Sequence, residues 1–133
     1  MSDSKDLALY MAQLAFDKKA FDLKILAVSD LVGYTDYIIV CSGRSDRQVQ
    51  AIADHVALSA KKERGVLPLG VEGESLGQWA LMDFGNVVVH VFNAPIREYY
   101  DVERLWGEAE QLEVETPPWE AEMRESLLEQ GIF

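Results

Sequence analysis

EGESLGQWALMDFGNVVVHVFNAPIREYY, residues 72–100, carries the strongest structural signals of this chain. Two apolar runs, at residues 78–82 and 87–92, flank Gly85-Asn86, a pair that is typical of a tight turn between antiparallel strands. The second run, VVVHVF, is rich in β-branched residues, which favour strands. Pro95 is typical of the first position of a helix. The stretch therefore predicts a β-hairpin followed by a helix.

The segment before residue 42 predicts one helix and two strands. Apolar residues at helical spacing indicate a helix over residues 4–19, with Ser4 as its N-cap. Strands are expected at residues 22–28 and 37–41. The run YIIVC at 37–41 contains no charged residue, which is typical of a central strand buried on both faces.

A second helix is expected after Ser45, and it has the best-defined ends in the chain. Ser45 and Gln48 form a capping-box pattern, in which each side chain bonds the backbone N–H of the other residue. Gly65 is a natural C-cap. One apolar stripe runs between these ends: Val49, Ile52, Ala53, Val56 and Ala60. Residues 67–77 contain Pro68 and three glycines, so we expect a loop or an irregular edge there.

The helix that begins at Pro95 is expected to continue to Trp106, because apolar residues recur at helical spacing. Pro117-Pro118 then ends regular structure. A last short helix is expected beyond it, with an apolar stripe that should pack on the body or on a second copy: Trp119, Met123 and Leu127, followed by Ile132 and Phe133.

The element order α-β-β-α-β-β-α predicts an α/β (α+β) fold, in which helices cover one mixed sheet. We place the main domain at residues 1–107 and an acidic C-terminal extension at 108–133. The extension holds eight Glu and one Arg, so it contributes −7 to the formal net charge of −11.

Composition and charge restrict the classes of function. A surface this acidic repels nucleic-acid phosphates and attracts a basic protein partner, with solubility alone as the competing explanation. No apolar run has membrane-spanning length, so we expect no membrane association. The N-terminus lacks the features of a signal or transit peptide, and the single Cys41 fits a reducing cytoplasm.

No catalytic or metal-binding constellation is visible. Cys41 lies in an apolar run without an activating neighbour, and His55 and His90 are too few for a zinc site. The turn at residues 42–45, Ser-Gly-Arg-Ser, could hold an anion on free N–H groups, as in nucleotidyltransferases. Those enzymes also need paired carboxylates for Mg²⁺, and the hairpin strands offer only Asp83. We therefore expect no enzyme activity, no metal and no cofactor.

The aromatic side chains between positions 79 and 106 have two interpretations. Trp79, Tyr99, Tyr100 and Trp106 form the group, and core packing explains some of them. Together with Asp83, Glu98 and Glu103 they also fit an aromatic-acidic surface, and aromatic side chains are typical anchors of protein interfaces. Spacing alone leaves both interpretations open.

Three segments resemble the Iojap family, the bacterial ribosomal silencing factors: TDYIIVCSGRSDRQVQAIADHV at 35–56, GVEGESLGQWALMDFGNVVVHVF at 70–92 and REYYDVERLW at 97–106. The resemblance extends over residues 5–107. It implies a fold related to nucleotidyltransferases but without their metal-binding carboxylates. It also implies a factor that binds the large ribosomal subunit through ribosomal protein number fourteen. Such factors block joining of the small subunit, lower translation when nutrients are short and often form homodimers.

We therefore predict a steric inhibitor without turnover that acts in a bacterial cytoplasm and makes no direct sequence-specific contact with nucleic acid. The residues predicted to contact the basic ribosomal partner are Trp79, Asp83, Tyr100, Glu103, Glu72 and Phe84. Two alternatives stay open, namely a nucleotidyltransferase-like nucleotide-binding protein that uses the turn at 42–45, and a dimeric assembly scaffold.

Overall fold

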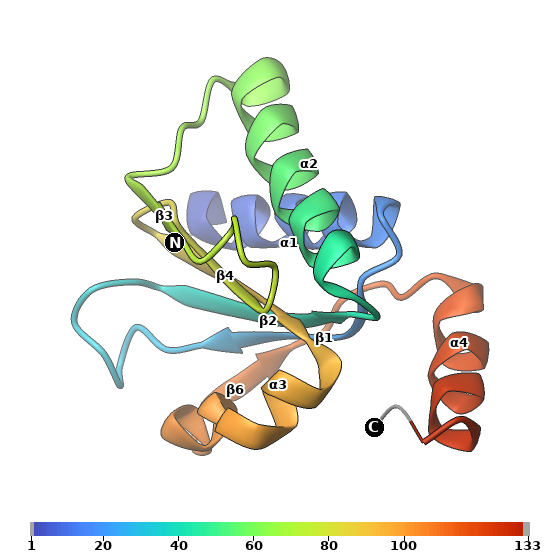
Figure 1. Ribbon diagram of the computed structural model, residues 1–133. Helices are drawn as coiled ribbons and strands as arrows, with labels where there is room; N and C mark the ends of the chain where they lie inside the picture. Colours follow the sequence, from blue (N-terminus) through green and yellow to red (C-terminus); the bar gives the residue numbers. More distant parts are fainter. Residues whose placement is uncertain (1, 132–133) are drawn as a thin grey trace.

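The computed structural model describes residues 2–131, which form one mixed sheet with helices on both of its faces (Figure 1). The elements in chain order are α1 (Ser2–Asp17), β1 (Phe21–Ala27), β2 (Tyr37–Gly43), α2 (Asp46–Arg64), β3 (Gly70–Glu72), β4 (Trp79–Asp83), β5 (Val87–Asn93), α3 (Ala94–Tyr100), the 3₁₀ helix η1 (Val102–Trp106), β6 (Glu110–Leu112) and α4 (Pro118–Glu129). The predicted mixed sheet covered by helices is confirmed.

The strand order in the sheet is β3-β4-β5-β2-β1-β6. The central strands β2 and β5 pair in parallel, and every other neighbouring pair is antiparallel. As YIIVC predicts, β2 is buried on both faces, since Ile38, Ile39, Val40 and Cys41 are all fully buried. The hairpin of β4 and β5 turns at Gly85, which has a φ of +89°.

Helices α1 and α2 cover one face of the sheet. Met11 of α1 and Ile52 of α2 pack in one buried cluster with Ile39 and Val89 of the central strands. The C-cap prediction for α2 is confirmed, because Gly65 has the left-handed φ of +66° and its N–H bonds the carbonyl of Lys61. This layer contains most of the large core, as the apolar stripe of α2 predicts.

Two predicted caps differ from those in the structure, one because of a long-range contact and one because of a local contact. Helix α1 begins at Ser2, ahead of Ser4, whose hydroxyl donates to Asp36 Oδ2 at 2.6 Å. Ser45 accepts from the Gln48 N–H as expected, but the Gln48 side chain accepts from the Arg44 N–H rather than from Ser45. A half-buried partner 32 positions away outweighs the local capping preference of the buried Ser4.

The opposite face of the sheet is covered by α3 and η1, and the prediction of one helix through Trp106 is wrong. Asp101 has a φ of +47° and a ψ of 49°, and this left-handed conformation ends α3 after Tyr100. The redirected chain lets Val102 and Trp106 of η1 pack with Phe92 on this face. Burial of these two side chains outweighs continuation of the helix.

The edge strands β3 and β6 are only three residues long each. Residues 70–72 of β3 lie in the segment expected to be a loop or an irregular edge, and β6 lies in the segment assigned to the extension. Such short polar strands have no periodicity that a sequence can reveal, and they form because β4 and β1 supply the ladder.

Helix α4 packs at the side of the sheet, next to the start of β1 (Figure 1). Leu127 is 5% exposed and clusters with Phe21, while the ring of Trp119 stands edge-on to Phe16 at 6.4 Å. The expectation that the apolar stripe packs on the body is confirmed for these residues. The terminal pair, Ile132 and Phe133, lies outside the described residues. Within residues 2–131, no helix combines the length and apolar character that membrane crossing requires.

Candidate protein interface

Strand β4 presents a half-exposed side to solvent. Ala80 and Met82 point toward α1 and α2 and are fully buried. The alternating residues Trp79, Leu81 and Asp83 lie on the other side and remain half-buried. The alternation of the strand therefore places one large aromatic, one aliphatic and one acidic side chain on the face that α3 and η1 only partly cover.

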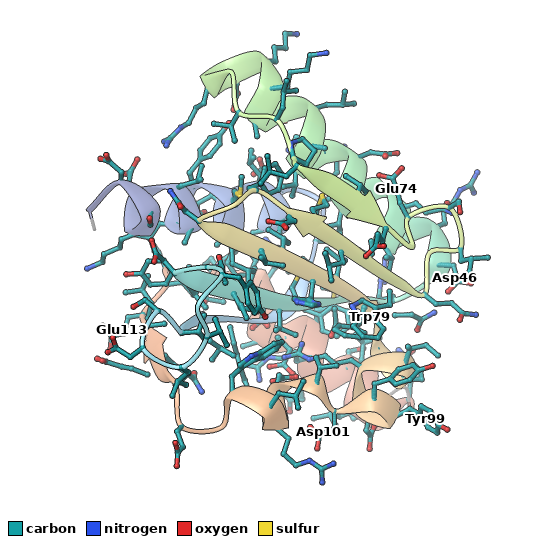
Figure 2. All side chains as sticks on the ribbon, turned by 90° about the vertical axis from the view of Figure 1, so that its left-hand side faces the viewer. Asp46, Glu74, Trp79, Tyr99, Asp101 and Glu113 are labelled. Atoms are coloured by element: carbon teal, nitrogen blue, oxygen red, sulfur yellow. The ribbon has the colours of Figure 1, made fainter. Side chains whose placement is uncertain are left out.

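Three aromatic residues, Trp79, Tyr99 and Tyr100, form what we call the aromatic surface. The ring of Trp79 stacks on buried Phe92 at 4.8 Å and lies 5.4 Å from the ring of Tyr100. Tyr100 is 52% exposed, and Tyr99, edge-on to Tyr100 at 5.0 Å, is 80% exposed. Figure 2 shows Trp79 beside α3, which carries Tyr99, and Asp101 where that helix ends. Trp79 is anchored on the core and the two tyrosines face solvent, so both interpretations of the aromatic residues hold in part.

His90 fixes the orientation of the Trp79 ring. The indole N–H of Trp79 donates to His90 Nδ1 at 3.1 Å, which leaves the imidazole proton on Nε2. His90 is almost completely buried, with the ring of Trp106 at 5.7 Å, and burial lowers its pKa to about 4. The imidazole is therefore neutral near pH 7 and acts as a hydrogen-bond acceptor within an aromatic cluster.

The loop at residues 73–77 is fitted closely against Trp79. Gly73 has a φ of +77°, and a Cβ on it would lie 2.0 Å from the Trp79 carbonyl oxygen. Gly77 has a φ of +70°, and a Cβ there would lie 2.4 Å from the Asp46 carbonyl oxygen. Only glycine satisfies both the left-handed backbone and the close approach, so the loop supports the backbone of Trp79 directly.

Acidic side chains flank the aromatic surface. Glu72 is exposed on β3 and pairs with Leu81, which places it on the same side of the sheet as Trp79. Asp83 is half-buried, and its Oδ1 accepts the Gly85 N–H at 2.8 Å in the hairpin turn. Asp101 follows Tyr100 directly and is exposed, with its carboxylate 3.9 Å from Arg104 Nε. The arrangement is an apolar centre with a negatively charged rim.

Two of the six predicted contact residues do not lie with the others. Phe84 is 8% exposed and packs in the core cluster under α1 and α2. Glu103 is half-buried, with its carboxylate 2.7 Å from Arg97 Nε and 3.3 Å from Lys24 Nζ. Burial alone would raise the pKa of Glu103, but the hydrogen bond and charge of Arg97, with Lys24, lower it. Glu103 therefore neutralises Arg97 instead of standing as a free surface charge.

Arg97 anchors α3 to the sheet. Its side chain is 8% exposed, and Nη1 donates to the Asp22 carbonyl at 2.6 Å and to Ser42 Oγ at 2.9 Å. These contacts link α3 to both β1 and β2.

The sequence analysis did not identify Asp101 and Leu81, which lie beside the aromatic surface. The two-residue period that starts at Trp79 indicates Leu81, whereas no local pattern indicates the left-handed Asp101.

The turn at residues 42–45 is already occupied by the protein's own groups. The Arg44 N–H donates to the Gln48 side chain, and Ser42 Oγ accepts from Arg97. Burial raises the pKa of the Cys41 thiol to about 12, which keeps it protonated and inert. Among residues 2–131, no three or more His, Cys, Asp or Glu side chains are grouped to hold a metal ion.

Fold and surface together define an α+β domain whose candidate site is an aromatic centre with an acidic rim. The family described as "Ribosomal silencing factor during starvation" matches residues 1–130. The chain therefore belongs to the ribosomal silencing factor family, which also includes the Iojap proteins.

Relatives from a bacterium and from a mammal agree with this assignment. A ribosomal silencing factor of Bacillus subtilis is 39% identical over 107 residues, which cover 80% of this chain and 90% of that protein. A mouse relative, named mitochondrial assembly of ribosomal large subunit protein 1, is 31% identical over 98 residues, which cover 72% of this chain and 43% of that protein.

The fold is also found in solved structures. A crystal structure of a Chromobacterium violaceum protein has a TM-score of 0.75 and 37% identity, and the match covers 85% of this chain and 88% of that one. A Bacillus halodurans structure has a TM-score of 0.73 and 34% identity, with coverage of 83% and 99%.

Proposed function

We propose that this protein binds the large ribosomal subunit through the basic ribosomal protein number fourteen and sterically prevents the small subunit from joining. Translation is thereby repressed when nutrients are limiting, in the bacterial cytoplasm and without turnover. The observation that carries the proposal is the aromatic surface, which combines solvent-facing rings with an acidic rim in a member of the silencing factor family. The name of the mouse relative, which refers to the large ribosomal subunit, supports the same target.

Each predicted contact residue has a specific role in this proposal. Trp79 and Tyr100 are the apolar anchors, because large aromatic side chains at the centre of an interface supply most of its binding energy. Glu72 and Asp83 attract the basic partner from the rim. Glu103 acts indirectly by neutralising Arg97 under α3. Phe84 supports β4 from the core side.

Sedimentation with purified ribosomal subunits tests the proposal. The wild-type protein should co-sediment with large subunits, not with small subunits alone, and it should lower the fraction of joined ribosomes in a reconstitution. Binding to small subunits only, or no effect on joining, would show that the proposed function is wrong.

Replacement of exposed tyrosines tests the placement of the interface. Tyr100→Ala should weaken binding to large subunits about 10- to 100-fold, because a central aromatic anchor contributes on the order of 2 kcal/mol. The matched control is Tyr34→Ala, which removes a tyrosine that is 62% exposed in the loop between β1 and β2. Equal affinities for the two variants would contradict the placement.

The nucleotide-binding alternative is less well supported, because the N–H of Arg44 and the hydroxyl of Ser42 in the turn already have protein partners. A titration with nucleoside triphosphate and Mg²⁺ should show no saturable binding. The scaffold alternative, including homodimers, is tested by the mass of the protein in solution with and without large subunits.

A further inference from the structure

Strand β1 contains an extra residue near its start. Phe21 pairs with Ser42 and Lys24 pairs with Val40, so three steps along β1 match two steps along β2. Asp22 lies inside this bulge with a φ of +49°, a backbone conformation that is unfavourable for a residue with a side chain. Such a conformation persists only where neighbouring contacts hold it, and both backbone polar groups of Asp22 have side-chain partners, one on α4 and one on α3.

One partner of the bulge comes from α3. Arg97 Nη1 donates to the Asp22 carbonyl at 2.6 Å and lies 3.6 Å from the Asp22 carboxylate. Arg97 is nine-tenths buried and stands three positions before Tyr100. The position of the Asp22 carbonyl therefore helps to set the orientation of the helix that carries the exposed tyrosines.

The other partner comes from α4, in the C-terminal extension. Glu120 Oε2 accepts the Asp22 N–H at 2.7 Å, and Arg124 Nε donates to Glu120 Oε1 at 3.0 Å. Glu120 is 2% exposed, unlike the exposed Glu122 on the same helix. A carboxylate is buried at a cost in desolvation, so a solvating role for Glu120 does not explain its position.

A second contact between α4 and α3 is apolar. Leu127 of α4 packs in one buried cluster with Phe21 of β1 and Ala94, the first residue of α3. Helix α4 therefore reaches α3 by two routes, a polar one through Asp22 and an apolar one through Ala94. Both routes converge at the point where α3 leaves the sheet.

We propose that α4 is a brace for the aromatic surface. Glu120 is a positioning residue that holds the Asp22 bulge and, through Arg97, fixes α3 so that Tyr99 and Tyr100 face the partner. This assigns the C-terminal extension a role in recognition without any contact with the partner itself. The part that concerns recognition rests on the proposed function, whereas the brace itself does not.

Amide hydrogen exchange of the full-length protein tests the brace without any ribosome. Glu120→Ala should exchange about tenfold faster at the Asp101 N–H, which bonds the Arg97 carbonyl at 2.8 Å, because α3 opens locally. Glu120→Gln keeps an acceptor oxygen and should lie between Glu120→Ala and the wild type. Glu122→Ala, the control with the same change of charge, should match the wild type. The amides of α2 serve as an internal reference.

Unchanged exchange at Asp101 in Glu120→Ala would overturn the brace, and so would an equal loss of protection in α2 and α3, which indicates general destabilisation. In binding assays with purified large subunits, Glu120→Ala should bind about tenfold more weakly, because a smaller fraction of molecules is binding-competent. Equal binding of Glu120→Ala and wild type would overturn the role in recognition. If the wild type itself does not bind large subunits, the proposed function fails, and the exchange experiment still decides on the brace.

Discussion

At the scale of single residues, the pair Trp79 and His90 shows how a buried polar group serves an exposed surface. A tryptophan whose ring is half-buried needs an acceptor for its indole N–H, and a neutral imidazole inside the sheet provides one at 3.1 Å. Phenylalanine at position 90 would fill the same space but leave that N–H without an acceptor. The histidine therefore has a structural role, which is to orient Trp79 of the aromatic surface.

The buried imidazole makes stability depend on pH. The pKa of His90 is about 4 in the folded protein and 6.5 in the unfolded chain, so between these values the unfolded chain binds the extra proton. Stability is therefore complete above about pH 6.5 and falls as the pH decreases toward 4, by about 2 kcal/mol at pH 5. Urea unfolding at pH 7 and pH 5 measures this loss. His90→Gln, which retains an acceptor but does not titrate, should lose less stability over the same pH interval. An equal loss in the variant and the wild type would contradict the conclusion that protonation of His90 causes the loss.

Gly73 offers a second test at this scale. Gly73→Ala places a Cβ against the Trp79 carbonyl in a left-handed backbone, so we expect the free energy of unfolding to fall by about 2–4 kcal/mol. Gly70→Ala is the control, because no atom lies within 4 Å of its Cβ position. Thermal unfolding of both variants measures the difference, and equal melting temperatures would show that the loop tolerates a side chain.

At the scale of secondary-structure elements, the surface is made by the phase of one strand and the end of one helix. The alternation of β4 selects Trp79, Leu81 and Asp83 for the accessible side. The left-handed Asp101 ends α3 directly after Tyr100, which leaves both tyrosines in the last turn of the helix, with Tyr100 close to the Trp79 ring and Tyr99 against Tyr100. If α3 continued as one helix through residue 106, the residues of η1 would pack differently, and the helix would no longer end after Tyr100.

Leu127 is the buried leucine on the inner face of helix α4. Leu127→Ala should lower the free energy of unfolding by about 2–3 kcal/mol, because it leaves a cavity against Phe21. Its neighbour Leu128 is 56% exposed, so Leu128→Ala should change stability by less than about 0.5 kcal/mol. Chemical denaturation of the two variants provides the comparison, and similar values would mean that α4 does not pack on β1 in solution.

At the scale of the whole molecule, charge and shape act on different steps of association. In the proposed complex, the field of the net charge of −11 attracts the basic partner from a distance, whereas the aromatic surface makes contact only after docking. On the proposed function, we therefore expect the acidic character to govern the rate of association and the aromatic rings to govern the lifetime of the complex.

Salt should separate these two steps. Electrostatic attraction is screened over about 8–10 Å near physiological ionic strength, so the association rate with large subunits should fall as salt increases. The dissociation rate should change less. Tyr100→Ala should raise the dissociation rate but leave the salt dependence of association unaltered. An association rate that is constant from low to high salt would mean that the charge serves solubility only.

The sequence alone determined the elements whose signal is local. The apolar run at residues 37–41, the stripe and C-cap of α2, and the turn at Gly85 depend on neighbours a few positions away, and the structure contains them as predicted. The family could also be identified from the sequence alone, because the motifs at residues 35–56 and 70–92 are each contiguous in the chain. The aromatic members of the surface also lie within one short stretch of chain.

The tertiary structure alone decided the features that depend on distant partners. Ser4 leaves its predicted cap position for Asp36, Glu103 is drawn inward by Arg97, and Phe84 turns to the core side of β4. The Glu120 carboxylate accepts a hydrogen bond from the backbone N–H of Asp22, which lies 98 positions earlier in the chain. Each of these contacts gains free energy only when the sheet brings the partners together, and no local pattern of residues encodes that encounter.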